Sequence, residues 1–210
     1  MALRILPFRQ YNENDVVNLY RSEAANASVT DSGDGDAGVF VKVSSADLNV
    51  GPVAYEDSSY LGKTDYAFVG ADQLPVVQNS FVPATSGNAV LGITLAQTAQ
   101  TDENGEKLIY YPQKQLELQA VHSGQAVPVL TKGVVTISSD AVAGGGTLTP
   151  GHYISISSTA GKIEGHAAKY DKSIGQVLAT GSRVAGLSAD QFAGSAGSTG
   201  TYSIIQIGSC

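Results

Sequence analysis

The chain has 210 residues, of which 42% are hydrophobic and only 15% charged, and its formal net charge is −7. This composition argues against a disordered chain, and the acidic balance argues against binding to nucleic acids or anionic membranes. The only cysteine, Cys210, excludes an internal disulfide and a cysteine zinc cluster. The 24 glycines favour many short strands joined by turns, and therefore an all-β fold.

Residues 1–30 are predicted as an N-terminal arm, with residues 1–14 extended. Pro7 and the polar residues that follow Arg9 oppose a regular helix there. The segment has no long apolar stretch of the kind found in signal peptides, so we expect synthesis in a reducing cytosol. Two interpretations remain open: the arm docks on a partner, or it packs on its own domain as a strand or tether.

Residues 31–120 are predicted as a first β unit. A loop at 31–38 leads into alternating apolar residues at 39–43, which indicate a strand. Residues 81–95 read as strand, turn and strand, and Asn104-Gly105 is a strong hairpin signal. Leu116 and Leu118 alternate with polar residues, which favours a strand with one apolar face.

Residues 121–210 are predicted as a second β unit, although both units together also fit one interleaved barrel. Strands are expected at 127–130, where Pro128 suggests a sheet edge, at 134–137, at 154–156 and at 204–207. A capping-box pattern predicts one short helix near 188–193. The expected architecture is thus one or two small β-barrel or β-sandwich units.

The glycine-rich loop 31–38 offers two ligand hypotheses, both weak. Gly33, Gly35 and Gly38 match a dinucleotide fingerprint by spacing, but a strand follows them where a helix is needed. Asp31, Asp34 and Asp36 would suit a loose calcium site, yet the later glutamate of an EF-hand is absent. We therefore expect a solvated turn, no cofactor and no metal.

Catalytic chemistry has little support in the sequence. The three histidines, His122, His152 and His166, lack partners at metal-ligand spacing, and no nucleophile-elbow motif is present. We expect no catalytic residues and no enzymatic activity. An aromatic binding patch remains conceivable from five of the ten tyrosines, namely Tyr55, Tyr60, Tyr66, Tyr110 and Tyr111.

Two segments carry a resemblance to a known family. PFRQYNENDVVNLY at 7–20 resembles the start of head-decoration (cement) proteins of marine and cyanobacterial tailed phages. SFVPATSGNAVLGI at 80–93 resembles a segment of phage capsid-stabilising β-barrel proteins, and 151–178 is similar in character. The resemblance implies a structural virion protein on the outer capsid surface that clamps neighbouring major capsid subunits, often as a homotrimer.

Under this resemblance, the N-terminal arm would form the clamp. Its residue types and position make Arg4, Phe8, Arg9 and Tyr11 the candidate capsid contacts. Binding to the expanded shell and not to free subunits would stabilise the shell by mass action. Two alternatives stay open: a receptor- or glycan-binding module of a phage fibre, with a clustered surface patch, or a hydrolase, with a pocket where a histidine meets a carboxylate.

Overall fold

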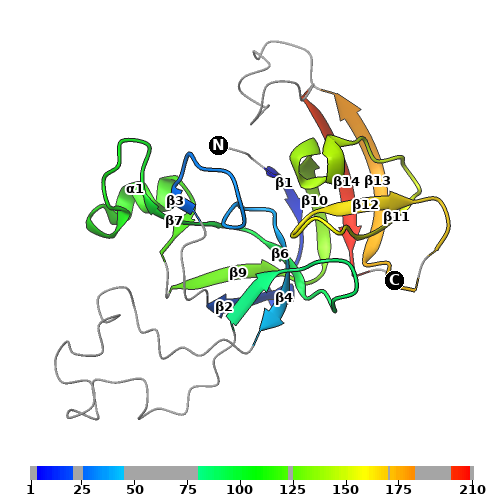
Figure 1. The fold of residues 1–210 in the computed structure, drawn as a ribbon, viewed down its shortest axis with the longest axis horizontal. Helices are drawn as coiled ribbons and strands as arrows, with labels where there is room; N and C mark the ends of the chain where they lie inside the picture. Colours follow the sequence, from blue (N-terminus) through cyan, green and yellow to red (C-terminus); the bar gives the residue numbers. More distant parts are fainter. Residues whose placement is uncertain are drawn as a thin grey trace, which may run out of the picture.

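The computed structural model describes residues 4–20, 26–44, 80–122, 125–169, 171–182 and 200–208. The chain is mainly β in these parts, as the sequence predicted, with one short α-helix (Figure 1). Strand pairings assign the strands to a six-stranded sheet, a ring of five strands and a small three-stranded sheet. The short helix predicted near 188–193 lies outside the described residues.

The six-stranded sheet has the order β1-β10-β14-β13-β11-β12, and all its neighbours are antiparallel. In β14, Ser203, Ile205 and Ile207 are buried while the residues between them are partly exposed, so the predicted final strand is confirmed with its two-residue period. The strands are β1 (Ile5–Gln10), β10 (Gly133–Ser138), β11 (Tyr153–Ile156), β12 (Ile163–His166), β13 (Gly175–Ser182) and β14 (Thr201–Ile207).

The pairings of five further strands run in a ring, in the order β2-β5-β4-β6-β9. Its closing joint between β2 and β5 is a single parallel pair, Tyr20 with Ser80, whereas β2 and β9 pair along five positions. The strands are β2 (Val16–Tyr20), β4 (Phe40–Ser44), β5 (Ser80–Pro83), β6 (Gly92–Thr94) and β9 (Ala126–Leu130).

The third sheet pairs β3, β7 and β8 in parallel and holds the helical part of the fold. Figure 1 places α1 beside β3 and β7, at the end of the molecule opposite β11 and β12. The elements are β3 (Asn26–Ser28), β7 (Gln97–Thr101), β8 (Ala120–Val121), α1 (Pro112–Glu117) and the 3-10 turns η1 (Glu13–Asp15), η5 (Leu108–Tyr110), η6 (Ser139–Ala141) and η7 (Ala143–Gly145).

The main hydrophobic core lies between the six-stranded sheet and the ring. It joins Ile5, Ile137 and Ile205 from the sheet to Phe40 and Leu130 from the ring, all of them nearly inaccessible. β1 pairs with β10, and β9 pairs with β2 and β6. Strands from before residue 120 therefore pair with strands from after it, in both the six-stranded sheet and the ring.

The N-terminal segment belongs to this body from residue 4 onward. β1 is an edge strand of the six-stranded sheet, and Ile5 is buried in the main core. Of the two interpretations of the predicted arm, packing on its own domain is the one seen for residues 4–20, because β1 and β2 pair with β10 and β9 and because Ile5 and Leu19 are buried.

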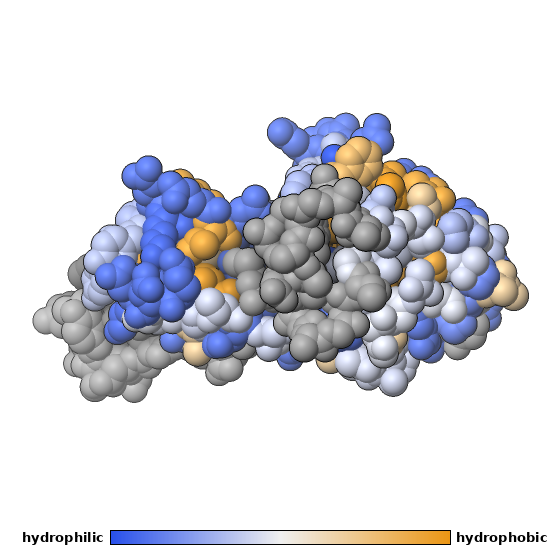
Figure 2. All heavy atoms as spheres, turned by 90° about the horizontal axis from the view of Figure 1, so that it is seen from above, coloured by the Kyte–Doolittle hydropathy of each residue, from blue (hydrophilic) through white to orange (hydrophobic). Residues whose placement is uncertain are grey.

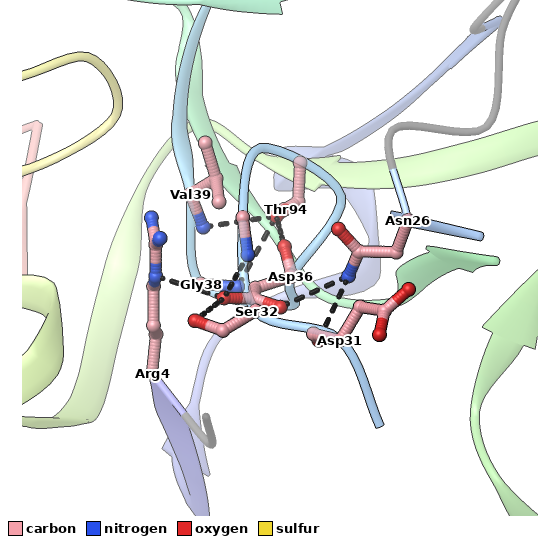
Figure 3. A network of polar contacts seen from close by, with 9 residues as sticks. Arg4, Asn26, Asp31, Ser32, Asp36, Gly38, Val39 and Thr94 are labelled. Carbon is pink, nitrogen blue, oxygen red and sulfur yellow. Dashed lines mark hydrogen bonds and ion pairs between the residues drawn. The ribbon is translucent and has the colours of Figure 1, made fainter. Parts of the chain in front are cut away.

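A buried polar network fixes loop 31–38 against β1 and β7 (Figure 3). The Asp36 carboxylate accepts hydrogen bonds from Asn26 Nδ2 at 3.0 Å and from the Gly33 amide at 3.1 Å. Arg4 Nε lies 3.1 Å from Asp36 Oδ2. A Cβ on Gly35 would come within 2.6 Å of the Thr98 carbonyl oxygen. Gly35 therefore allows the loop to pack closely against β7.

The region after the Asn104-Gly105 turn differs from the prediction. The turn forms, with Gly105 at φ +81°, but the apolar alternation at Leu116 and Leu118 belongs to α1 and its C-terminus, and no strand is formed there. Pro112 occupies the first turn of α1, where a missing N–H is harmless, and helix-favouring residues follow it.

Candidate functional site

Residues 102–118, called here the η5–α1 tip, expose four large apolar side chains. The exposed fractions are 49% for Ile109, 72% for Tyr110, 46% for Tyr111 and 78% for Leu116. Leu108, next to them, is fully buried. Apolar atoms lie open among hydrophilic ones in the part of the molecule that contains α1, β3 and β7 (Figure 2).

The tip is held from below by a small hydrophobic cluster. Leu108 packs with Val29, Ala99 and Ala120, and Leu118 covers the side of this cluster. Leu108 therefore fixes the start of η5 on the third sheet, and the three residues that follow it are exposed.

Polar contacts hold the outer part of the tip. Asp102 Oδ1 accepts hydrogen bonds from the amides of Asn104 and Glu106, both at 2.8 Å. Lys114 of α1 forms an ion pair with Asp102, and its Nζ also lies 3.1 Å from Glu103 Oε1. The hydrogen bond from Lys114 holds the pKa of Asp102 below its usual range. The turn and α1 are thereby joined through one carboxylate.

The charges around the apolar side chains are mostly acidic. Glu103, Glu106 and Glu117 are exposed, and of the two lysines of the tip only Lys107 is fully exposed. Lys114 is already engaged by Asp102 and Glu103. The tip therefore combines an apolar surface with an acidic border.

A groove of about 450 Å³ opens where β1, β2, β9 and the end of the tip meet, and we call it the N-terminal groove. Two of the four predicted capsid contacts, Arg9 and Tyr11, line it. The remaining lining residues are Glu13, Val16, Asn18, Leu95, Ala96, Gln119 and Pro128.

The other two predicted contacts have opposite environments. Phe8 is 58% exposed and is available to a partner. Arg4 is 6% exposed and lies against Asp36, and its backbone carbonyl accepts a hydrogen bond from the Ser138 amide. The Arg4 guanidinium is thus used inside the fold, and its contact with a partner stays a prediction that this burial does not favour.

One histidine does meet a carboxylate. A second groove, of about 380 Å³, contains His166, Ser155 and Glu164 on the β11–β12 hairpin. Ser155 Oγ lies 2.8 Å from His166 Nε2, and Glu164 Oε1 lies 3.4 Å from the same nitrogen. A Ser-His-acid triad needs the acid on the other ring nitrogen, where it orients the ring. Here the Ser155 hydroxyl and the Glu164 carboxylate both lie against Nε2 of His166. The carboxylate therefore does not orient the ring from the opposite nitrogen, as the triad mechanism of hydrolysis requires.

The remaining predicted site residues do not assemble into a site. Asp36 points into the buried network, while the Asp31 carboxylate accepts a hydrogen bond from the Ser28 amide, so the suggested calcium ligands do not converge. No group of three metal-binding side chains occurs within the residues that the structure describes. His122 is buried, and burial lowers its pKa, while a hydrogen bond to the Leu108 backbone acts in the opposite direction.

Of the five tyrosines considered as a patch, Tyr110 and Tyr111 lie together on the tip, and Tyr55, Tyr60 and Tyr66 lie outside the described residues. The sequence analysis named Tyr110 and Tyr111 only as two of five tyrosines that could form an aromatic patch, and did not place them beside Ile109 and Leu116. The available signal was the run LIYYP, in which four large apolar residues stand next to a proline and between charged segments.

Comparison with known proteins gives no relative. No family model, no curated protein and no solved structure matches the chain. Among the described residues, no helix has both the length and the apolar character needed to cross a membrane.

Proposed function

We propose that this protein is a structural virion component that attaches to the outer surface of a tailed-phage capsid through its η5–α1 tip. The observation that carries the proposal is the exposure of Ile109, Tyr110, Tyr111 and Leu116 on one anchored excursion of the fold. The sequence resemblance of segments 7–20 and 80–93 to capsid decoration proteins supplies the kind of partner.

Exposed apolar clusters of this kind favour a protein partner. Full burial of an exposed large apolar side chain contributes about 1.5–3 kcal/mol, and the four side chains of the tip, which are 46–78% exposed, would each gain a part of this on association. Tyrosines at the centre of an apolar patch are typical of the residues that dominate binding energy in protein interfaces. The contacts of Asp102 with the turn and with Lys114 keep the tip ordered before binding, which lowers the entropic cost of docking.

The acidic residues of the tip favour a partner surface that carries positive charge. Glu103, Glu106 and Glu117 favour a capsid surface where lysines or arginines surround an apolar depression. The proposal moves the main contact away from the N-terminal residues, since Arg4 is buried and β1 is paired. Phe8 remains a prediction as an additional contact.

In this proposal the protein acts by mass action. It binds the assembled, expanded shell and not free major capsid subunits, so each bound copy stabilises the shell. Assembly as a homotrimer, which the family resemblance suggests, would present three tips to neighbouring capsid subunits and multiply a modest affinity per site.

The test is co-sedimentation of the purified protein with expanded capsids and, separately, with unassembled capsid protein. We expect the wild type to pellet with capsids only. The double variant Tyr110→Ser with Leu116→Gln should bind at least ~10-fold more weakly, which corresponds to ~1.4 kcal/mol. Leu178→Gln is the control, because Leu178 is an exposed leucine on β13, outside the tip.

Two results would contradict the proposal. The first is a wild-type protein that stays in the supernatant with expanded capsids. The second is a tip variant that folds, as shown by an unchanged circular dichroism spectrum, and still pellets as well as the wild type.

A further inference from the structure

The N-terminal groove has the chemical layout of a small-ligand site. Its apolar floor consists of Val16, Leu95, Ala96 and Pro128, of which Leu95 and Ala96 are buried. Its volume is about 450 Å³, and it is shallow and open to solvent. The groove is separate from the four apolar side chains of the tip, none of which lines it.

The rim supplies groups that bind hydroxyls. Asn18 and Gln119 each carry an amide that donates through its nitrogen and accepts through its oxygen, as a sugar hydroxyl also does. Tyr11 contributes an aromatic ring that is 39% exposed and therefore accessible to a flat apolar face of a ligand. Amides beside one accessible ring suit a ligand with alternating polar and apolar faces.

The charges at the rim balance one another. Arg9 brings a guanidinium whose Nε donates to the Leu6 carbonyl at 3.2 Å, and Glu13 brings an exposed carboxylate. One positive and one negative group favour a neutral ligand, because a net anion or a net cation would meet a like charge within the same groove. Both groups can still bond to hydroxyls.

Gln119 follows the C-cap of α1 directly, and its exposed side chain lines the groove. It is the only residue other than glycine with a positive φ, +48°, among the described residues. Its carbonyl accepts from the Gln97 amide at 3.1 Å, and its amide donates to the Leu116 carbonyl at 3.0 Å. A left-handed residue directly after the C-cap is a common way to end a helix, so this φ marks the end of α1.

From this layout we propose that the N-terminal groove binds a neutral saccharide of one or two rings. The Tyr11 ring lies against the apolar face of a sugar ring, and Asn18 and Gln119 bond to its hydroxyls. Arg9 and Glu13, which also line the groove, can bond to further hydroxyls. The site is independent of the proposed capsid attachment, since it uses none of the exposed apolar residues of the tip.

The test is saturation-transfer NMR of the full chain with a panel of neutral disaccharides built from glucose, galactose, mannose and N-acetylglucosamine. We expect transfer to at least one disaccharide, with a Kd of about 1 mM for a shallow site. Tyr11→Ala and Asn18→Ala should each weaken binding about tenfold, and Tyr110→Ala should leave it unchanged. Tyr110 is the matched control, because it is an exposed tyrosine outside the groove.

The proposal is overturned if no disaccharide of the panel shows transfer, or if transfer persists unchanged in folded Tyr11→Ala and Asn18→Ala proteins. It is also overturned if the tip variant, and not the groove variants, loses the signal. Failure of capsid co-sedimentation alone would leave the groove proposal standing, because the two experiments use different residues and different ligands.

Discussion

Arg4 and Asp36 form a buried ion pair, with 3.1 Å between Arg4 Nε and Asp36 Oδ2. It is a charge contact and not an aligned hydrogen bond, since Arg4 Nε and Nη1 are buried without a hydrogen-bond partner. The pair joins the start of β1 to loop 31–38 (Figure 3). Its consequences for stability follow from burial of both charges.

We expect Asp36→Asn to lower the free energy of unfolding by about 3–5 kcal/mol, because it leaves the Arg4 guanidinium buried without a counter-charge. The double variant Arg4→Met with Asp36→Asn should recover part of this loss, because no charge is then left buried. Asn26 and the Gly33 amide bond to different oxygens of Asp36, and the single side-chain oxygen of asparagine can accept from one of them. Urea unfolding of the wild type and the two variants measures the effect. A double variant less stable than Asp36→Asn would contradict the interpretation.

The same pair predicts a pH dependence. Burial raises the pKa of Asp36 above 3.8, and the charge of Arg4 opposes this rise. The folded protein therefore binds this proton more tightly than the unfolded chain, so the group favours folding at acid pH and loses this contribution as pH rises through its folded pKa. In Arg4→Met the opposing charge is gone. We expect its destabilisation to be small at acid pH and largest near neutrality, measured by urea unfolding across a pH series.

The sequence predicts those parts of this fold in which the conformation of a residue is determined by its neighbours along the chain. The two-residue period of Ile205 and Ile207 marks β14 because a strand with one buried face imposes that period on its own residues. The turn at Gly105 is predictable for the same local reason. At Leu116 the period was misleading, because Pro112 starts a helix that has no buried side chain.

The candidate sites depend on distant residues and were therefore not predictable in detail. The N-terminal groove brings Tyr11, Leu95 and Gln119 together only through the pairing of β2 with β9 and of β7 with β8. Arg4 was chosen as a partner contact from residue type and position alone. Its burial depends on Asp36, which sequence reasoning had placed in a solvated loop.

The ion pair of Lys114 predicts how the tip responds to acid. Because the hydrogen bond from Lys114 lowers the pKa of Asp102 below 3.8, the ionised carboxylate stabilises the fold above that pH, and this contribution is lost as pH falls through the folded pKa. We expect Lys114→Gln to raise the Asp102 pKa toward 3.8, measured by NMR titration of its carboxyl carbon. The amides of Asn104 and Glu106 should then exchange faster. Lys107→Gln, on the same tip, should change neither.

His122 predicts a second acid-sensitive step, beneath the tip. Burial lowers its pKa below 6.5, so the unfolded chain binds this proton more readily than the folded protein. Stability therefore declines as pH falls below 6.5. We expect His122→Gln to flatten this decline in urea unfolding and to remove the acid-induced increase in hydrogen exchange of the Leu108 region. A variant with the wild-type pH profile would show that another group is responsible.

Gly35 in loop 31–38 tests whether glycine is needed there because neighbouring atoms leave no room for a side chain. A Cβ at Gly35 would lie 2.6 Å from the Thr98 carbonyl oxygen and 2.9 Å from the Asn26 amide nitrogen, and both atoms belong to the backbone of the third sheet. We expect Gly35→Ala to destabilise the protein by about 1–3 kcal/mol or more, since the sheet must shift to admit one methyl group.

Gly146→Ala is the matched control, because Gly146 has φ −73° and the nearest atom to its added Cβ is 3.7 Å away. Alanine at this position should leave the stability of the protein unchanged, or raise it by about 0.4–1 kcal/mol because it lowers the conformational entropy of the unfolded chain. Thermal and urea unfolding of both variants make the comparison. Equal effects at the two positions would mean that the loop is not closely packed against β3 and β7. The interpretation that the Arg4–Asp36 contact holds β1 against this loop would then lose its support.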